Sequence, residues 1–227
     1  MIVGERKPFE EIMEMISPYK KVLIIGCGGC VTVCLTGGEK QADTLASQIR
    51  LAANEKGLDL TVAVDCITRQ REREFVDNLK EDPRQYDAVL SIACGAGVQF
   101  MSDVFEDVPF LPGLNTSFLG YNKEQGIWEE NCRGCGDCVL AWTGGICPIA
   151  RCSKSLINGA CGGTDKGKCE VSQDMDCAWY LIYERLKARG KLDELRKMRT
   201  AKDWCKDRGA GVRRLVLKEM VEEETAG

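Results

Sequence analysis

The cysteine and histidine content constrains this chain more than any other feature. Its 227 residues include 14 cysteines and no histidine. The lack of histidine excludes Ser-His-Asp and Cys-His catalysis, histidine-ligated zinc and Rieske centres. Any metal held by this protein would therefore need ligands that are mainly thiolates or carboxylates.

So many cysteines are unusual for the compartment that the sequence indicates. Residues Met1–Pro8 lack the apolar stretch of a signal peptide, and the longest apolar run, Val22–Leu35, is too short to span a membrane. We therefore expect a cytoplasmic protein without membrane insertion. Disulfides are rare in the cytoplasm, so the cysteines indicate metal or cluster ligation, and burial as small apolar side chains would explain only one or two. The net charge of -4 argues against a nucleic-acid partner.

Apolar patterning in residues 1–121 alternates between strand and helix. Continuous aliphatic runs predict buried strands at Lys21–Ile25, Leu58–Val64 and Tyr86–Ala93. Helical spacing predicts helices at Glu39–Lys56, Ile67–Lys80 and about 96–105, and we expect a fourth strand and its return at Val108–Tyr121. This order predicts a Rossmann- or flavodoxin-like α/β sandwich, with helices on both faces of a parallel sheet.

The rest of the chain is expected to form two further regions. Residues 122–190 are rich in glycine and cysteine and poor in aliphatic residues, so we expect a ferredoxin-like segment that folds around metal. Helical spacing returns at Ala178–Ala188 and Lys191–Lys206. The second of these helices would begin a helical tail over residues 191–227, with a frayed acidic end at 222–227.

Three cysteines follow the first three predicted strands: Cys27, Cys66 and Cys94. The carboxyl ends of parallel strands open at one edge of a sheet, so these thiols should converge there, joined by Cys30 at CxxC spacing. Four thiolates suit a cubane iron–sulfur cluster or an all-thiolate zinc site, and Cys34 could replace one of them. The alternatives are a nucleotide in the glycine-rich loop after the first strand, and buried free thiols.

A second set of cysteines begins with the CxxCxxC run Cys132, Cys135 and Cys138, and Cys147 follows before a proline. The pattern is close to that of bacterial ferredoxins, in which tight loops aim sulfurs at a cluster and small residues leave amides free to hydrogen-bond them. Eight residues precede Cys147 where ferredoxins have three, so the fourth ligand is either Cys147 or Cys152. The prediction is an iron–sulfur cluster, and a zinc ribbon is the alternative.

A third set consists of cysteines eight or nine positions apart: Cys152, Cys161, Cys169 and Cys177. Eight cysteines between residues 132 and 177 suit two four-thiolate sites. The further site could hold a second [4Fe–4S] cluster or Zn²⁺, so we expect one to three clusters in the whole chain. Cys205 is expected to be a spare thiol in a helix.

Three segments carry a resemblance to a known family: Cys147–Gly163, Gly167–Glu170 and Cys177–Glu184. They resemble the methylenetetrahydrofolate reductase C-terminal family, and in particular the small cysteine-rich subunit, described with iron–sulfur or zinc, of the acetogen-type reductases. The resemblance covers about residues 1–185. It is specific in the cysteine-rich half and looser in the sheet half.

The resemblance also implies a function. In that family the small subunit accompanies a TIM-barrel flavoprotein that carries FMN and reduces methylenetetrahydrofolate. It implies that this chain passes electrons from a ferredoxin- or hydrogenase-type donor to that FMN, within the one-carbon metabolism of the Wood–Ljungdahl pathway. The chain would then have no catalytic residues of its own and would be inactive alone. The alternative is a zinc-binding structural or assembly subunit of the same reductase.

Overall fold

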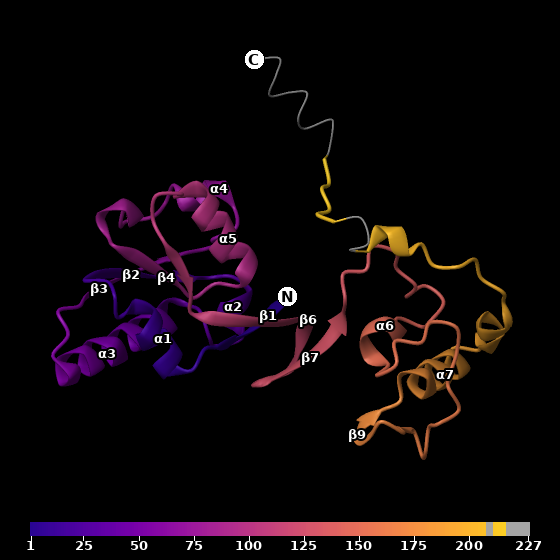
Figure 1. Cartoon of the computed structure of the whole chain (residues 1–227). Helices are drawn as coiled ribbons and strands as arrows, with labels where there is room; N and C mark the ends of the chain where they lie inside the picture. Colours follow the sequence, from indigo (N-terminus) through magenta and orange to yellow (C-terminus); the bar gives the residue numbers. More distant parts are fainter. Residues whose placement is uncertain (208–210, 217–227) are drawn as a thin grey trace, which may run out of the picture. The chain divides into compact units, whose positions relative to one another are not determined.

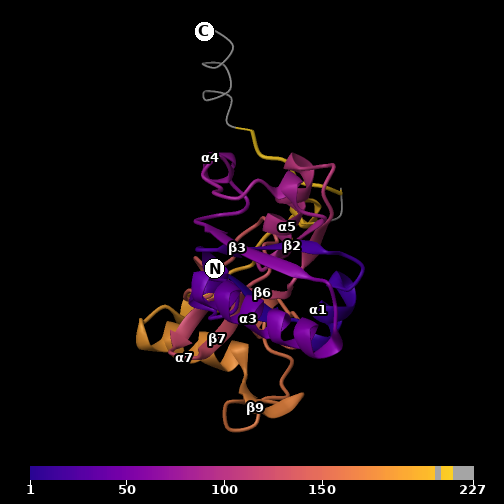
Figure 2. The same cartoon turned by 90° about the vertical axis from the view of Figure 1, so that its left-hand side faces the viewer.

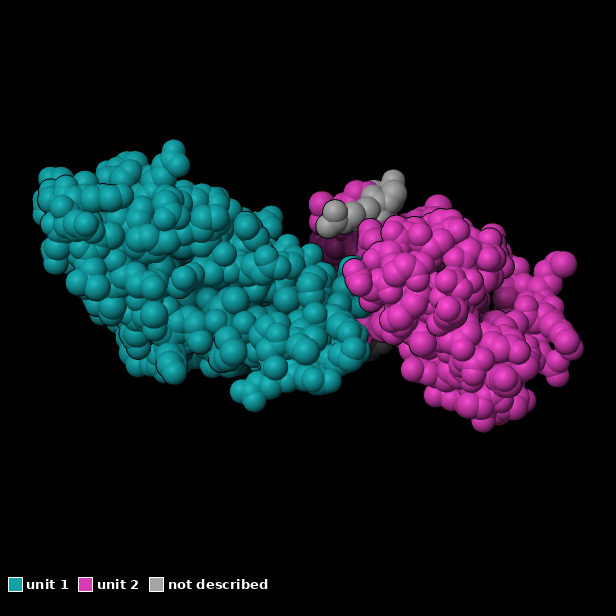
Figure 3. All heavy atoms as spheres, turned by 90° about the horizontal axis from the view of Figure 1, so that it is seen from below, with its two compact units in different colours: residues 1–130 teal, residues 131–227 magenta. Residues whose placement is uncertain are grey.

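The computed structural model describes residues 1–207 and 211–216, so the acidic end expected at 222–227 lies outside the described residues. Part of the tail expected at 191–227 lies outside them as well. The chain forms two compact units, Met1–Glu130 and Asn131–Gly227, which Figure 3 colours separately.

The first unit is built on a four-stranded sheet in which every printed pairing is parallel. β2 (Lys21–Cys27) lies at its centre, between β3 (Thr61–Ile67) and β4 (Ala88–Ser91), and β5 (Phe110–Pro112) pairs with the other side of β4. All six residues Val22–Cys27 are buried, as a strand covered on both faces requires. The predicted mixed α/β architecture with a parallel sheet is confirmed.

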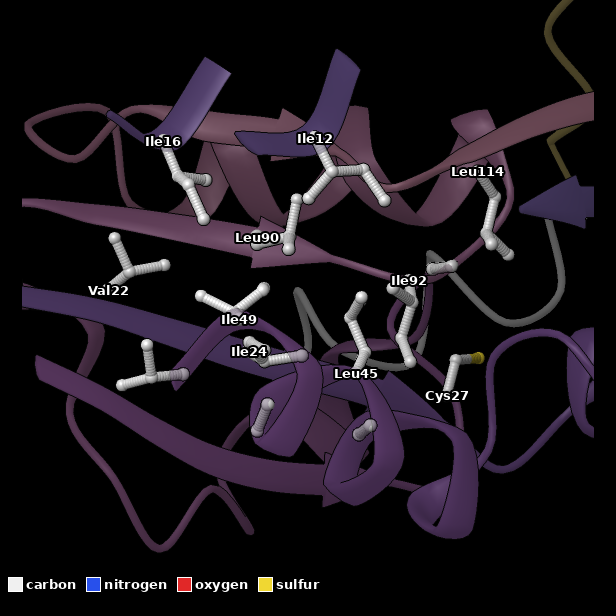
Figure 4. Packing of buried hydrophobic residues seen from close by; sticks show 14 of the residues in the cluster. Ile12, Ile16, Val22, Ile24, Cys27, Leu45, Ile49, Leu90, Ile92 and Leu114 are labelled. Carbon is white, nitrogen blue, oxygen red and sulfur yellow. The ribbon is translucent and has the colours of Figure 1, made fainter. Parts of the chain in front are cut away.

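Helices cover both faces of this sheet (Figures 1 and 2). α1 (Phe9–Ile16) and α3 (Glu39–Lys56) pack on the face to which Val22 and Ile24 point, and Figure 4 shows this cluster. The opposite face carries Leu23 and Ile25, which pack with residues of α4 (Arg73–Val76) and α5 (Gly95–Val104). The alternation of side chains along β2 therefore serves two separate apolar cores.

A second sheet of the first unit has the strand order β1-β6-β7. Its strands are β1 (Ile2–Arg6), β6 (Leu114–Glu124) and β7 (Ile127–Cys132). The segment expected as a fourth strand and its return is thus divided between two sheets. The chain changes sheet at Gly113, where a Cβ atom would lie 2.7 Å from the Ile92 side chain. Two short elements complete the unit: α2 (Cys30–Val33) and the 3₁₀ turn η1 (Pro83–Gln85).

The second unit has few regular elements: α6 (Pro148–Arg151), β8 (Lys168–Cys169), β9 (Ser172–Asp176), α7 (Ala178–Ala188), and the 3₁₀ turns η2 (Leu192–Arg196) and η3 (Trp204–Lys206). Its buried apolar cluster is small and centres on α7, with Trp179, Ile182 and Leu186 packed beside Ile146. Most of the unit is loop, and the cysteines lie in or beside these loops.

The predicted helices Glu39–Lys56 and Ala178–Ala188 are confirmed residue for residue as α3 and α7. The helix predicted at Ile67–Lys80 is wrong, because only α4 is helical there. Buried Gln70 donates hydrogen bonds to the carbonyls of Ile25 and Gly26, at 2.8 and 3.0 Å, and this ties the segment to the end of β2. Hydrogen bonds to the sheet thus replace those of a continuous helix.

The helix predicted at Lys191–Lys206 is also wrong. The segment contains only η2 and η3 with irregular chain between them. Lys202 and Asp203 bind Asp137 there, and these contacts to a distant loop displace the helical pattern. The predictions also missed β1 and α1, which precede β2. No helix among residues 1–207 and 211–216 is long and apolar enough to cross a membrane.

Candidate metal and cluster sites

The first unit has a cavity of about 280 Å³ beside the carboxyl ends of β2 and β4. Cys27, Cys30 and Cys94 line it, together with Gln70 and Arg71. In the strand order β3-β2-β4-β5, β3 lies next to β2 on one side and β4 lies next to β2 on the other, so the strand order reverses at β2. Ligands of open α/β sheets bind at such a reversal of strand order.

Each of these three cysteines is positioned by the end of a regular element. Cys27 is the last residue of β2, Cys30 is the first residue of α2, and Cys94 immediately precedes α5. The Cys27 amide donates to the carbonyl of Gly37, at 2.7 Å. A Cβ atom on Gly37 would lie only 2.1 Å from the Ile92 carbonyl, so the close approach that fixes this loop requires glycine.

Arg71 gives the cavity a positive charge next to two of its thiols. Burial would raise the pKa of Cys30, but hydrogen bonds from the Ile2 backbone and the Arg71 guanidinium outweigh it, so the pKa lies below its usual value. Arg71 also interacts with Cys94. The cavity therefore favours a thiolate at Cys30, and a thiolate is the form that binds metals.

Cys66 and Cys34 lie elsewhere. The residues that line the cavity in the described part of the chain do not include Cys66. Its sulfur packs against Gly26, and burial, followed by the charge of Glu39 on α3, raises the pKa of Cys66 to about 11. The Cys34 thiol donates to the Ile2 carbonyl at 3.7 Å, and burial raises its pKa. The structure thus gathers three of the four predicted strand-end ligands around one cavity.

In the second unit, the CxxCxxC loop (Cys132–Cys138) begins where β7 ends. The Gly134 amide points at the Cys132 sulfur, with an N–S distance of 3.4 Å. Gly134 and Gly136 have φ angles of 62° and 80°, a left-handed conformation that glycine adopts without strain. The loop therefore has a backbone form that aims an amide at the sulfur of a cysteine.

The cysteines of the third set all line one small cavity of about 20 Å³: Cys152, Cys161, Cys169 and Cys177. They come from four different places in the chain, since Cys152 follows α6, Cys161 lies in a loop, Cys169 ends β8 and Cys177 precedes α7. Four cysteines from separate segments thus line one cavity.

Charged and polar groups surround this small cavity. Lys154 forms an ion pair with Glu170, and the Cys161 thiol lies 3.5 Å from Glu170 Oε1. The pKa of Cys169 is lowered by the backbone amide of Val171 and then by the Ser153 hydroxyl. The Val171 amide and the Ser153 hydroxyl thus stabilise a thiolate at Cys169, whereas the Glu170 carboxylate opposes it.

Whether these sites can bind a metal depends on which side chains they offer as ligands and on where those side chains lie. Among residues 1–207 and 211–216, no three Cys, Asp or Glu side chains are placed as a group that could hold a metal ion. The donor chemistry nevertheless fits a thiophilic metal, because four thiols line a single small cavity. Binding would require these thiols to turn toward its centre.

Sequence reasoning missed the polar residues between β3 and α4. Arg69, Gln70 and Arg71 all line the cavity of the first unit. Gln70 is fully buried and also accepts a hydrogen bond from the Ser91 hydroxyl, at 2.6 Å. The only signal in the sequence is the charge of Arg69–Glu74, where five of six residues are charged. Because this stretch lies within the helix predicted at Ile67–Lys80, it gives no indication of a cavity.

Comparisons with known proteins bear on the second half of the chain. Residues 111–205 match the model of a family described as methylene-tetrahydrofolate reductase C terminal. No curated protein and no solved structure matches the chain. The match includes all nine cysteines from Cys132 to Cys205 and none of the residues that line the parallel-sheet cavity. Residues 111–205 are therefore a domain like the C terminus of methylene-tetrahydrofolate reductase.

Proposed function

We propose that this chain is an iron–sulfur electron-transfer subunit, which delivers electrons to the FMN of a partner methylenetetrahydrofolate reductase subunit. The observation that supports metal ligation most is that Cys152, Cys161, Cys169 and Cys177 line one cavity within the matched domain. Cys152 and Cys177 also pack against the small apolar core around α7, whereas Cys161 and Cys169 are not part of that core. Ligation of a metal centre would give all four thiols a common role.

In the proposed mechanism, the clusters would transfer the electrons and the residues of this chain would hold the clusters in place. A cluster supplies one-electron transfer when it is bound. The CxxCxxC loop presents thiolates and aims the Gly134 amide at sulfur, and such hydrogen bonds tune a cluster's potential. The partner's flavin would collect two electrons in succession, and the folate pocket and catalytic acid would lie on the partner. The upstream donor would be a ferredoxin- or hydrogenase-type protein.

A zinc-binding structural or assembly subunit of the same reductase is the second candidate, and the size of the small cavity favours it at that site. Its volume of about 20 Å³ is close to that of one water-sized sphere, which suits a single ion better than a cubane. An all-thiolate Zn²⁺ site is closed and contributes directly to folding. The two candidates differ in whether any site of the chain is redox-active.

Metal analysis of the anaerobically prepared full chain separates them. The proposal predicts at least about four irons per chain, with matching sulfide, since this is the content of one cubane. It also predicts broad visible absorbance that dithionite bleaches, and an EPR signal in the reduced protein. Zinc without iron and no reducible absorbance would support the structural subunit instead.

Cys135→Ala extends the test to one site. Cys135 lies in the CxxCxxC loop, so its loss should release iron and slow electron entry into the flavin while FMN stays on the partner. Cys34→Ala is the matched control, because that thiol is buried against β1 and lines none of the described cavities. Full iron retention and normal turnover in Cys135→Ala would contradict the proposed role.

A further inference from the structure

The second unit has nine cysteines, and it is not yet decided which of them would be the fourth ligand of a site on the CxxCxxC loop. Four of them line the small cavity, and three lie on the CxxCxxC loop. Two cysteines remain, Cys147 and Cys205, and a four-thiolate site on that loop would need one of them. The ferredoxin-like spacing favours Cys147, which precedes a proline. Contacts in the folded chain favour Cys205.

We propose that Cys205 supplies the fourth thiolate to the site on the CxxCxxC loop, and that Cys147 is the spare thiol. This assignment rests on the proposed function, in that the loop is taken to bind a metal centre. It replaces the expectation that Cys205 is an unused thiol in a C-terminal helix.

The first line of support is that the segment around Cys205 packs on the loop from both sides. Before Cys205, the Asp203 amide donates to Asp137 Oδ2, at 3.0 Å. After it, the Lys206 carbonyl lies so close to Gly136 that a Cβ atom there would be 2.6 Å away. Cys205 is therefore carried on a turn, η3, whose two ends both touch the loop.

The second line of support is the charge around the loop. The Lys202 side chain is only 2% exposed, and its ammonium group donates to the Asp137 carbonyl and lies 3.9 Å from the Asp137 carboxylate. Arg213 donates to the carbonyls of Gly134 and Lys206, at 2.6 and 3.1 Å, and so joins the loop to the Cys205 segment. A metal centre with four thiolates carries net negative charge, which Arg213 would help to offset, while Lys202 balances the Asp137 carboxylate on the same loop.

Cys147 is held by a different part of the unit. It is the residue before α6, and its carbonyl accepts the Arg151 amide at 2.9 Å. Its neighbours Ile146 and Pro148 are buried, and Ile146 packs with the side chains of α7. Its backbone is thus fixed by the small core, whereas Cys205 is exposed and its segment contacts the loop.

The test compares serine variants of the full chain after anaerobic reconstitution with iron and sulfide. Cys132→Ser sets the loss expected when the loop site fails. We expect Cys205→Ser to lose the same share of iron and the same EPR component, and Cys147→Ser to keep both. Loss with Cys147→Ser and retention with Cys205→Ser would overturn the assignment and leave the proposed function intact. Unchanged iron in all three variants would overturn both.

A measurement on the unmodified protein covers the case in which both single variants lose iron through misfolding. Alkylation of each cysteine is compared between metal-free and reconstituted protein by peptide mass spectrometry. We expect reconstitution to slow the labelling of Cys205 at least tenfold and to leave the rate at Cys147 unchanged. Protection gained at Cys147, or an unchanged rate at Cys205, would overturn the assignment.

Discussion

At the scale of single residues, two thiols near the carboxyl edge of the parallel sheet differ in their pKa. Arg71 and the Ile2 backbone lower the pKa of Cys30, whereas burial raises that of Cys66 to about 11. The sequence placed Cys66 after a predicted strand and Cys30 at CxxC spacing from Cys27, but it could not reveal this difference. Spacing identifies which strand a thiol follows. The position of the Cys66 sulfur depends on its packing against Gly26, and the charge of Cys30 depends on Arg71 in a later loop.

The pH dependence of alkylation tests this contrast in the metal-free protein. Only the thiolate reacts, so at pH 7 Cys30 should be labelled by iodoacetamide at least tenfold faster than Cys66. Arg71→Gln removes a stabilising positive charge, which raises the pKa of Cys30 and shifts its labelling profile to higher pH. Arg73→Gln is the control, since Arg73 pairs with Asp77 on the surface. An unchanged profile in Arg71→Gln would show that the arginine does not act on Cys30.

At the scale of elements, regular helices could be predicted and irregular segments could not. α3 and α7 have continuous helical spacing, and Gly57 ends α3 in a left-handed conformation. The helices predicted at Ile67–Lys80 and Lys191–Lys206 fail because hydrogen bonds to distant residues override local propensity. The number of cysteines between residues 132 and 177 indicated two four-thiolate sites, but which cysteines line one cavity, and which residues contact the Cys205 segment, depend on how the loops fold.

Two glycine variants separate steric from conformational effects on these elements. Gly37→Ala would force a Cβ atom against the Ile92 carbonyl and disturb the loop that holds Cys27, at a cost of about 3 kcal/mol in unfolding free energy. Gly57→Ala meets no atom within 4 Å and costs only its left-handed conformation, about 1 kcal/mol. Denaturant unfolding of both variants measures the difference. Equal losses would contradict the role given to the close approach at Gly37.

At the scale of the whole molecule, the two units should depend on metal to different degrees. The first unit has two apolar cores on either side of β2, whereas the second has one small cluster around α7 and many loops. A chain segment with so little apolar burial needs another source of folding free energy, which the proposed metal–thiolate bonds would supply.

Hydrogen exchange with and without metal tests that difference. Removal of metal by a chelator should speed exchange of the α7 amides at least tenfold, because the helix begins directly after Cys177. Exchange in β2, at the centre of the parallel sheet, should change less than twofold. Equal acceleration in both elements would mean that the units do not differ in this way.

Electron transfer into the partner's flavin tests the central claim most directly. The reconstituted chain and the flavoprotein are mixed anaerobically with a limiting reduced ferredoxin-type donor, and the bleaching of FMN is followed by stopped-flow absorbance. The account predicts that the unmodified chain speeds flavin reduction at least a hundredfold over the flavoprotein alone, and that Cys135→Ala abolishes the gain. Equal flavin reduction with the unmodified chain, with Cys135→Ala and with no added chain would contradict it.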